Sequence, residues 1–352
     1  MAAGFMLYGS TGFVGRVMAR MAVERGLPLI VAGRNAEKVV TQAARLGVEG
    51  LVFSLDDPAA MERALARVVA VLNCAGPYIH TAIPMVAACL RTGTHYLDIT
   101  GEIPVLEALA ACDAEARTRQ VMLLPAVGFD VLPTDCLALY LKQRLPSATR
   151  LALAFHGRGP SRFPPGSLNT LLETIIPYGF KLRRDGRLEP FPRKLKTRWI
   201  DFGRGPVEAT LFPWADAFTA YYSTQIPNIE NYVVISAEMR RMLELVLRLR
   251  SLFRLAAIRR FLRSQIKSGS TAEERLRTQT SVWGEATDAQ GRTTAARLHG
   301  PEGSVIWTSL AALAVVEQVL AGDAPPGFQT PALAYGADFV LQSEGVRRED
   351  LS

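Results

Sequence analysis

The sequence predicts an α/β protein: a doubly wound parallel sheet, followed by a second α+β domain that contains a mixed or antiparallel sheet. In about the first 130 residues, short apolar runs alternate with helix-forming stretches, as βαβ units require. Beyond residue 135 the pattern changes, and residues 185–186 and 288–291 are typical of hairpin turns. A chain of 352 residues is also long enough for two hydrophobic cores.

Six strands of the first domain are expected, each an apolar run that ends in a turn or helix signal. In chain order they are residues 5–8, 29–32, 51–53, 69–74, 95–98 and 121–124. Gly47 closes the helix after the second strand, and Asp57 followed by Pro58 starts the helix after the third. We expect a parallel-sheet domain at residues 1–134 and an α+β domain at 135–304. The apolar helix at 305–320 begins a segment, 305–352, that should return to the first domain.

A glycine-rich turn follows the first strand, and a helix extends from it to Arg25. This order is typical of the Rossmann-type fold, because the first glycine permits a tight turn, the second admits phosphate to the backbone, and the third packs the helix on the sheet. The helix N-terminus adds partial positive charge and N–H donors. The residues predicted to bind the pyrophosphate of a dinucleotide are Gly9, Thr11, Gly12, Phe13, Val14 and Gly15.

The second strand ends at Gly33-Arg34-Asn35, with Lys38 one turn later. A site for NAD usually has an acid here to bind the ribose hydroxyls, and this chain has none. Arg34 and Lys38 instead provide positive charge for a 2′-phosphate, which predicts NADP(H) as cofactor. The alternative is that Arg34 is an ordinary surface side chain and Asn35 merely caps the helix.

Further candidate residues follow the next strands, because ligands of open α/β sheets bind beyond the carboxyl ends of the strands. Ser54 and Leu55 follow the third strand, and we expect them at the cofactor. Ala75, Gly76 and Pro77 follow the fourth, where small residues let the nicotinamide ribose lie against the backbone.

Two candidates for catalysis lie next to these positions. Tyr78 is either a proton donor or carbonyl-polarising group beside the nicotinamide, or a packing aromatic. Asp98 could form an acid pair with Glu102, or either carboxylate could cap the following helix. The sequence contains no Ser-His-Asp spacing, no metal-ligand cluster and no Walker lysine, and we predict no metal.

The amino-acid composition limits the compartment and the partners that this protein can have. The four cysteines are widely spaced and have no CxxC pair, which indicates reduced thiols and a cytoplasmic protein. No signal peptide fits ahead of the first strand. The net charge of +7 is concentrated in residues 238–267, without a nucleic-acid-binding motif, so nucleic acid is not expected as a partner.

Residues 238–267 combine arginines with apolar side chains at helical spacing, among them Met239, Met242, Leu243 and Leu249. Such a helix can lie peripherally on an anionic membrane surface or cover an acyl substrate. The alternative is an ordinary helix whose apolar face belongs to the core. We expect the second domain to bind a small-molecule or lipid-like substrate, or to form the interface of a homodimer.

With these residues assembled, the chain resembles the saccharopine-dehydrogenase-like oxidoreductases, and within them the trans-acting enoyl reductase branch. The similar segments of the first domain are Tyr8-Gly9-Ser10-Thr11-Gly12-Phe13-Val14-Gly15-Arg16, Ala32-Gly33-Arg34, Asn73-Cys74-Ala75-Gly76-Pro77-Tyr78, Tyr96-Leu97-Asp98-Ile99-Thr100-Gly101-Glu102 and Gly128-Phe129-Asp130. Those of the second half are Pro213-Trp214-Ala215-Asp216, Ile226-Pro227-Asn228, residues 270–275 and Gln329-Thr330-Pro331-Ala332. Ser54 replaces an aspartate that the family usually places near the adenine, and Ala215 replaces a glycine.

The resemblance implies NADPH and a C=C or C=N acceptor. Three hypotheses follow. The first is an NADPH-dependent reductase of a lipid-like or polyketide-like enoyl substrate. The second is saccharopine-type reduction of an imine between an amino acid and an oxo acid, with Arg158 and Arg162 available for its carboxylates. The third is a non-catalytic NADP-binding protein that docks to membranes through the basic helix.

Overall fold

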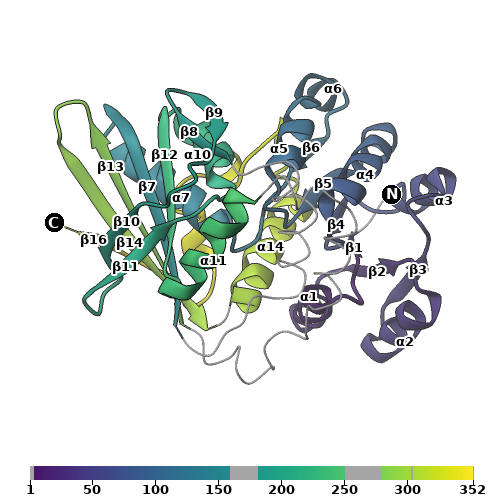
Figure 1. Cartoon of the computed structure of the whole chain (residues 1–352). Helices are drawn as coiled ribbons and strands as arrows, with labels where there is room; N and C mark the ends of the chain where they lie inside the picture. Colours follow the sequence, from purple (N-terminus) through teal and green to yellow (C-terminus); the bar gives the residue numbers. More distant parts are fainter. Residues whose placement is uncertain (1–3, 159–180, 250–278, 303, 352) are drawn as a thin grey trace. The chain divides into compact units, whose positions relative to one another are not determined.

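Seven parallel strands form the sheet that the sequence predicts, in a computed structural model that describes residues 4–158, 181–249, 279–302 and 304–351 (Figure 1). The strand order is β15-β6-β5-β4-β1-β2-β3, so the winding direction reverses between β1 and β4. The strands are β1 (Phe5–Tyr8), β2 (Leu29–Gly33), β3 (Glu49–Val52), β4 (Ala70–Asn73), β5 (His95–Asp98), β6 (Met122–Leu124) and β15 (Gly327–Phe328). Every β1 side chain is buried, as expected for a central strand covered on both faces.

Helices accompany these strands, and some of them begin at predicted signals. They are α1 (Phe13–Glu24), α2 (Ala36–Leu46), α3 (Pro58–Leu65), α4 (Tyr78–Thr92), α5 (Ile103–Ala110), α6 (Asp113–Thr118), α14 (Ser304–Leu320) and α15 (Pro331–Tyr335). Asp57 accepts the Ala60 N–H at 3.0 Å, so the predicted cap of α3 is confirmed. Gly47 follows α2 with φ +68°, a left-handed conformation that glycine adopts without strain.

The second sheet is mixed. Its main path is β10-β11-β12-β7-β13-β14-β16, with β8 beside β12 and β9 beside β8. Among the strands that the structure describes in this sheet, only β12 and β7 pair in parallel. The strands are β7 (Ala148–Arg158), β8 (Lys181–Arg184), β9 (Arg187–Pro190), β10 (Thr197–Asp201), β11 (Pro206–Leu211), β12 (Asn228–Val233), β13 (Gln279–Asp288), β14 (Thr293–Glu302) and β16 (Arg347–Leu351). The accompanying helices are α7 (Leu132–Arg144), α10 (Asp216–Thr224), α11 (Ala237–Arg248) and the 3₁₀ helix η3 (Phe339–Gln342). Both predicted hairpin turns are confirmed, at β8–β9 and β13–β14.

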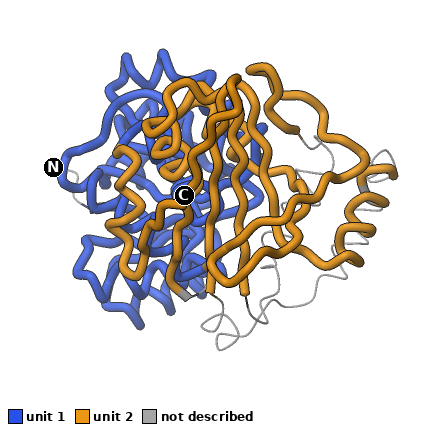
Figure 2. Tube along the Cα trace, turned by 90° about the vertical axis from the view of Figure 1, so that its left-hand side faces the viewer, with its two compact units in different colours: residues 1–132, 305–334 blue, residues 133–304, 335–352 orange. Residues whose placement is uncertain are grey.

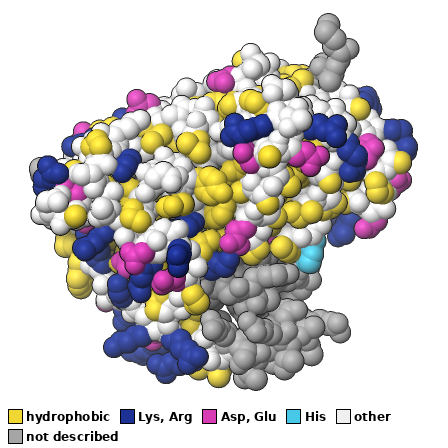
Figure 3. Space-filling model, turned by 90° about the horizontal axis from the view of Figure 1, so that it is seen from above, with side chains coloured by type: hydrophobic (Ala, Val, Ile, Leu, Met, Phe, Trp, Pro, Cys, Tyr) yellow, Lys and Arg dark blue, Asp and Glu magenta, His cyan; other side chains and the backbone are white. Residues whose placement is uncertain are grey.

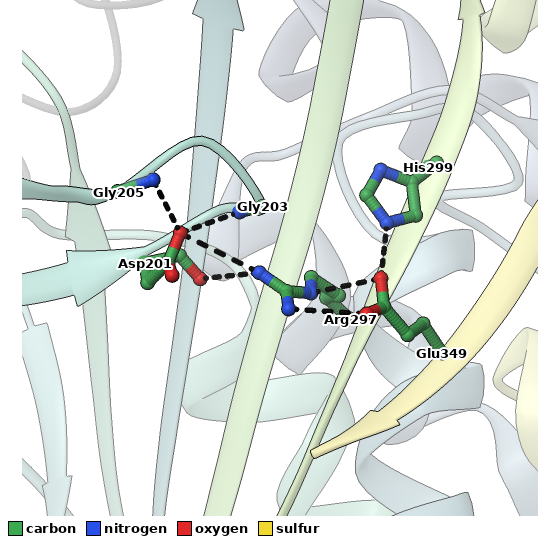
Figure 4. Close-up of polar contacts among 6 residues, drawn as sticks. All are labelled: Asp201, Gly203, Gly205, Arg297, His299 and Glu349. Atoms are coloured by element: carbon green, nitrogen blue, oxygen red, sulfur yellow. Dashed lines mark hydrogen bonds and ion pairs between the residues drawn. The ribbon is translucent and has the colours of Figure 1, made fainter.

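The β10–β11 hairpin curls over one face of this sheet and is tied to β14 and β16 by an ion-pair network (Figure 4). Arg297 on β14 lies 3.5 Å from Asp201 at the end of β10, and its Nε lies 3.0 Å from Glu349 on β16. Asp201 also accepts the N–H groups of Gly203 and Gly205, and His299 lies 2.9 Å from Glu349. A hydrophobic cluster lies under the curled hairpin; it includes Ile200, Tyr232, Trp283 and, from α11, Leu243 and Leu247.

The contacts divide the chain into two units (Figure 2): Met1–Leu132 with Val305–Ala334, and Pro133–Ser304 with Tyr335–Ser352. The expected third segment, 305–352, is therefore split. Residues 305–334 join the parallel sheet, whereas 335–352 do not, because β16 pairs with β14. In the described ranges no helix is long and apolar enough to cross a membrane. On the face drawn in Figure 3, most groups of Lys and Arg side chains have acidic side chains beside them.

Candidate functional site

The glycine turn after β1 is packed so closely at Gly9 and Gly15 that larger residues would not fit at these two positions. A Cβ on Gly9, which has φ +79°, would lie 2.8 Å from the backbone nitrogen of Ala75, and one on Gly15 would collide with the carbonyl oxygen of Gly9. Gly12 is the N-cap of α1, whose first turn contains no acid. The turn therefore presents helical N–H groups and no negative charge, which fits the pyrophosphate of a dinucleotide.

Gln42, which the sequence analysis did not identify, fixes the conformation of this turn. Its side-chain Nε2 donates to the carbonyl of Ser10 at 3.0 Å, and its Oε1 accepts the Ser10 hydroxyl at 2.8 Å. Ser10 is fully buried, so these hydrogen bonds are shielded from water. The two residues are 32 positions apart, and no local pattern in the sequence connects them.

Arg34 and Lys38 are exposed at the end of β2 and the start of α2. Asn35 caps α2 by accepting the Lys38 N–H at 2.9 Å, which confirms the capping interpretation for Asn35. Within the described ranges the Arg34 side chain has no ion-pair partner, so its guanidinium is available for a 2′-phosphate.

Tyr8 lies beside the Arg34 position. Its ring packs on Phe53 with centroids 5.0 Å apart, and its hydroxyl donates to the Phe53 carbonyl at 3.3 Å. Burial raises the pKa of Tyr8, the Arg34 charge acts against this, and Asp56 adds to it. Asp56 in turn accepts the Ser54 hydroxyl at 3.0 Å. The predicted Ser54 thus lies in the same corner as Arg34, with Leu55 next to it in a half-buried turn.

The loop after β4 is held by Asn73, the last residue of that strand, and by Thr81 of α4. Asn73 Oδ1 accepts the Ala75 N–H at 3.0 Å, and the Thr81 hydroxyl donates to the Ala75 carbonyl at 2.7 Å. Asn73 Nδ2 also donates to Thr81 at 3.2 Å. The loop Ala75-Gly76-Pro77 therefore has a defined position next to Gly9, as the predicted cofactor contact requires.

Tyr78 is the first residue of α4 and is 8% exposed. Glu102 fixes its backbone: the two carboxylate oxygens accept the N–H groups of Tyr78 and Ile79 at 2.9 and 2.8 Å. Burial, and then the nearby acidic groups, raise the pKa of the Tyr78 phenol well above its ordinary value. The phenol therefore stays protonated near neutral pH and can act as a donor. Glu102 is the N-cap residue of α5, yet its side chain caps α4 instead.

Asp98 is fully buried at the end of β5, and both of its oxygens accept hydrogen bonds. Oδ1 accepts the N–H groups of Thr100 and Ala126, each at 2.9 Å, and Oδ2 accepts the Tyr96 hydroxyl at 2.8 Å. Burial raises the pKa of Asp98 to about 6, although these hydrogen bonds act in the opposite direction. This geometry favours a positioning role for Asp98, which ties the ends of β5 and β6 together. Its catalytic role remains a prediction.

All the predicted site residues belong to one unit and follow the carboxyl ends of β1 to β5. The remaining candidates, which we expected to contact a substrate or a membrane, lie outside this unit. Arg158 ends β7 in the second unit, whereas Arg162 lies outside the described residues. Of the basic segment 238–267, residues 238–249 are described. Of its four described leucines, Leu243 and Leu247 are buried, whereas Leu245 and Leu249 are exposed. The core face of α11 therefore includes Leu243 but not the exposed Met239, Met242 or Leu249 that we had grouped with it.

Comparison with known proteins shows which proteins this chain is similar to. Residues 5–124 match the family model described as the saccharopine dehydrogenase NADP binding domain. A saccharopine dehydrogenase-like oxidoreductase of Rattus norvegicus is 28% identical over 230 residues, which are 55% of this chain and 52% of that protein. The human protein of the same name is 31% identical over 227 residues, with the same shares. A trans-acting enoyl reductase of Mycobacterium leprae is 32% identical over 148 residues, which are 40% of this chain and 35% of that protein.

The chain thus spans about half the length of the first of these relatives, and less of the mycobacterial one. Among solved structures, the apo saccharopine dehydrogenase (L-Glu forming) of Saccharomyces cerevisiae matches 99% of both chains with a TM-score of 0.66 and 14% identity. This likeness shows the fold and confirms the predicted fold class. Residues 5–124 of this chain are thus similar to the saccharopine dehydrogenase NADP binding domain, and they contain the closely packed glycine turn described above.

Proposed function

We propose that this protein is an NADPH-dependent oxidoreductase that reduces the C=C bond of a lipid-like or polyketide-like enoyl substrate. One observation carries the oxidoreductase part: the glycine turn leaves an acid-free helix N-terminus beside the Ala75-Gly76 loop, at the reversal point between β1 and β4. Dinucleotides bind at such a point in open α/β sheets. Arg34, which has no ion-pair partner among the described residues, supports NADPH over NADH.

When bound, the nicotinamide supplies the hydride. The protein's own contribution begins with α1, whose N-terminal N–H groups hold the pyrophosphate, and with Arg34, which binds the 2′-phosphate. The Tyr78 hydroxyl is protonated at neutral pH and donates a hydrogen bond to the substrate carbonyl or a proton to the α-carbon. Burial raises its pKa and makes the phenol a weaker acid, which favours the first of these roles. Glu102 holds Tyr78 in place through its backbone.

The choice of a C=C acceptor rests on the similarity to the mycobacterial trans-acting enoyl reductase. Saccharopine-type reduction of a C=N bond is the alternative, since the first relatives are named saccharopine dehydrogenase-like. A direct comparison decides between them. NADPH oxidation should be followed at 340 nm with enoyl thioesters of increasing chain length, and separately with amino acid and oxo acid pairs. If only the amino acid and oxo acid pairs are turned over, the enoyl proposal is wrong, but the proposal that the protein is an oxidoreductase still holds.

Cofactor binding is tested first, by titrating NADPH and NADH and recording nicotinamide fluorescence. The structure offers Gly12→Ala as a selective variant. A Cβ there would lie 3.1 Å from the Gly9 carbonyl oxygen, which a small adjustment accommodates, but it would stand where phosphate must approach. We expect at least tenfold weaker NADPH binding with near-native thermal stability. If wild-type protein binds neither nucleotide, both reductase proposals fail.

A peripheral membrane location is a separate proposal, supported by the described part of α11. Met242 and Leu245 are 54% and 55% exposed, beside the exposed Arg241 and Arg248. Leu243 and Leu247 anchor the opposite face in the core. An exposed apolar stripe flanked by arginines suits an anionic lipid surface. Should the protein bind NADPH and anionic vesicles but reduce neither substrate set, the non-catalytic hypothesis would be the one retained.

A further inference from the structure

The second unit contains a cavity of about 580 Å³, built on the face of the sheet that the β10–β11 hairpin covers. Three rows of side chains cross β12, β7 and β13 on this face, because alternate residues of a strand point the same way. The register places Tyr232, Ala154 and Trp283 in the first row, Glu230, Ala152 and Glu285 in the second, and Asn228, Arg150 and Thr287 in the third. Along this face, the first row therefore belongs to the apolar core, the second row carries two carboxylates, and the third row forms the polar mouth of the cavity.

Both carboxylates of the second row are already neutralised by cations from β10 and the residue before it. Arg198 Nη2 lies 2.7 and 2.8 Å from the two oxygens of Glu285, and its guanidinium lies 4.8 Å from the centre of the Trp283 ring. Lys196 Nζ lies 2.9 Å from Glu230, which also accepts the Tyr232 hydroxyl at 2.6 Å. The glutamates therefore orient Arg198 and Lys196, and both cations keep further N–H donors for a ligand.

Two other arginines, Arg150 and Arg184, line the cavity. Arg150 is exposed and has no polar partner among the residues that the structure describes. Arg184 lies 3.9 Å from Glu189, and its charge reaches Glu230 across the cavity, where it helps to lower the pKa of that carboxyl against the effect of burial. Asn228 keeps this corner rigid, because its side chain accepts the Asp185 N–H and donates to the Thr149 carbonyl.

Five cationic side chains and three carboxylates line the cavity, which leaves a net formal charge of +2. One of the five, Arg183, donates to the carbonyls of Ala217 and Gly186 and adds its charge from beneath. We propose that this cavity binds the phosphate group of a small molecule, with Arg150, Arg184 and Lys196 as its ligands. The site is distinct from the nucleotide site and independent of the proposed reductase activity.

Phosphate fits these groups better than other anions. Guanidinium groups bind phosphate oxygens in pairs, and a phosphate can accept from several donors at once. A monoester dianion also matches the net charge of +2. The volume lies within the range of small-molecule sites, so there is room for an organic body attached to the phosphate.

The experiment measures protection of individual arginines in the full chain. The protein is treated with phenylglyoxal, with and without inorganic pyrophosphate as probe, and modification is quantified by peptide mass spectrometry. We expect pyrophosphate to slow modification of Arg150 and Arg184 at least threefold, and to leave Arg187 unchanged. Arg187 is exposed on β9 but does not line the cavity, so it is the matched control. Equal rates at Arg150 with and without pyrophosphate would overturn the proposal.

Binding measurements on variants provide a second test of the proposal. Arg150→Ser should weaken pyrophosphate binding to the cavity about tenfold or more, because one charge-assisted contact is lost, whereas Arg187→Ser should not. Because the proposed nucleotide site would also bind pyrophosphate at the glycine turn, the titration is done in a Gly12→Ala background. Both serine variants remove exposed side chains, and unchanged melting temperatures show that they fold. A citrate titration separates phosphate recognition from general anion binding: citrate binding as tight as pyrophosphate would contradict the phosphate assignment.

Discussion

The carboxylate of Glu102 accepts the backbone N–H of Tyr78 at 2.9 Å, although the two residues stand at the starts of different helices. The same carboxylate accepts the Ile79 N–H, so one side chain satisfies two donors at the N-terminus of α4. Its negative charge also complements the positive end of the α4 dipole. Glu102 therefore sets the position of Tyr78, the residue that we expect to donate a proton in catalysis.

Replacement of Glu102 tests this relationship. Glu102→Gln keeps one acceptor oxygen but places an NH₂ group against a backbone N–H, and we expect a loss of about 1–3 kcal/mol in the free energy of unfolding. Urea denaturation measures it. Glu107→Gln, on the same helix and partly exposed, is the control. An unchanged free energy of unfolding in Glu102→Gln would show that the cap contributes nothing to stability.

Tyr78→Phe tests the catalytic assignment. Turnover should fall well over tenfold while NADPH affinity stays within about twofold, because the phenol acts on the substrate and not on the cofactor. Since the pKa of Tyr78 is raised well above its ordinary value, the wild-type rate should show no ionisation of this group near neutral pH. Tyr222→Phe, at a partly exposed tyrosine of α10, is the control. Undiminished turnover in Tyr78→Phe would remove the phenol from the mechanism.

Arg34→Ser tests cofactor preference. The loss of a guanidinium at the 2′-phosphate should weaken NADPH binding about tenfold to a hundredfold and leave NADH binding nearly unchanged. The measurement is fluorescence titration with both nucleotides. Arg20→Ser removes an exposed arginine of α1 and should alter neither affinity. An equal loss for both nucleotides would mean that Arg34 contacts the adenosine common to them.

Asp98 makes stability depend on pH. Its pKa is about 6 in the folded protein, above the value of 3.8 for a free aspartate, mainly because of burial. The folded state then binds more protons between pH 4 and 6, so this group's contribution to stability is greatest at low pH and is lost as pH rises through 6. The free energy of unfolding of wild type minus that of Asp98→Asn should therefore fall between pH 4 and 6, by on the order of 2–3 kcal/mol. A difference that stays constant or rises would contradict the raised pKa.

Vesicle co-sedimentation tests the exposed face of α11. Arg241→Ser and Arg248→Ser should each weaken binding to vesicles that contain anionic lipid about fivefold, since one basic residue near such a surface contributes about 1 kcal/mol. Leu245→Gln should weaken it further by removing apolar contact. Val40→Gln, which changes an exposed apolar residue on α2, is the control. Binding that survives high salt and all three α11 changes would exclude this helix as the contact.

Much of the nucleotide-binding unit could be predicted because its signals are local. Glycines placed between an apolar run and a helix, a proline after an N-capping aspartate, and Asp-Gly at a turn each act on backbone within a few residues. For this reason β1 and β5 were predicted with their observed bounds, and the start of α3 and the turn between β8 and β9 were predicted at their observed positions. The end of the chain was predicted less well. Residues 335–352 belong to the unit of the second sheet, because β16 pairs with β14, some fifty residues earlier.

The sequence by itself determined the fold class, the glycine turn and the basic end of β2, since each depends on residue types at short spacing. Only the tertiary structure decided what the buried polar groups do. In the folded chain Gln42 hydrogen-bonds to the glycine turn, and the side chain of Glu102 caps α4 and not α5. Asp98 accepts hydrogen bonds from three donors. The tertiary structure also placed Arg150, Arg184 and Lys196 around one cavity. The physical reason is that a buried donor, acceptor or charge must find its partner wherever the folded chain provides one, often at large separation in sequence.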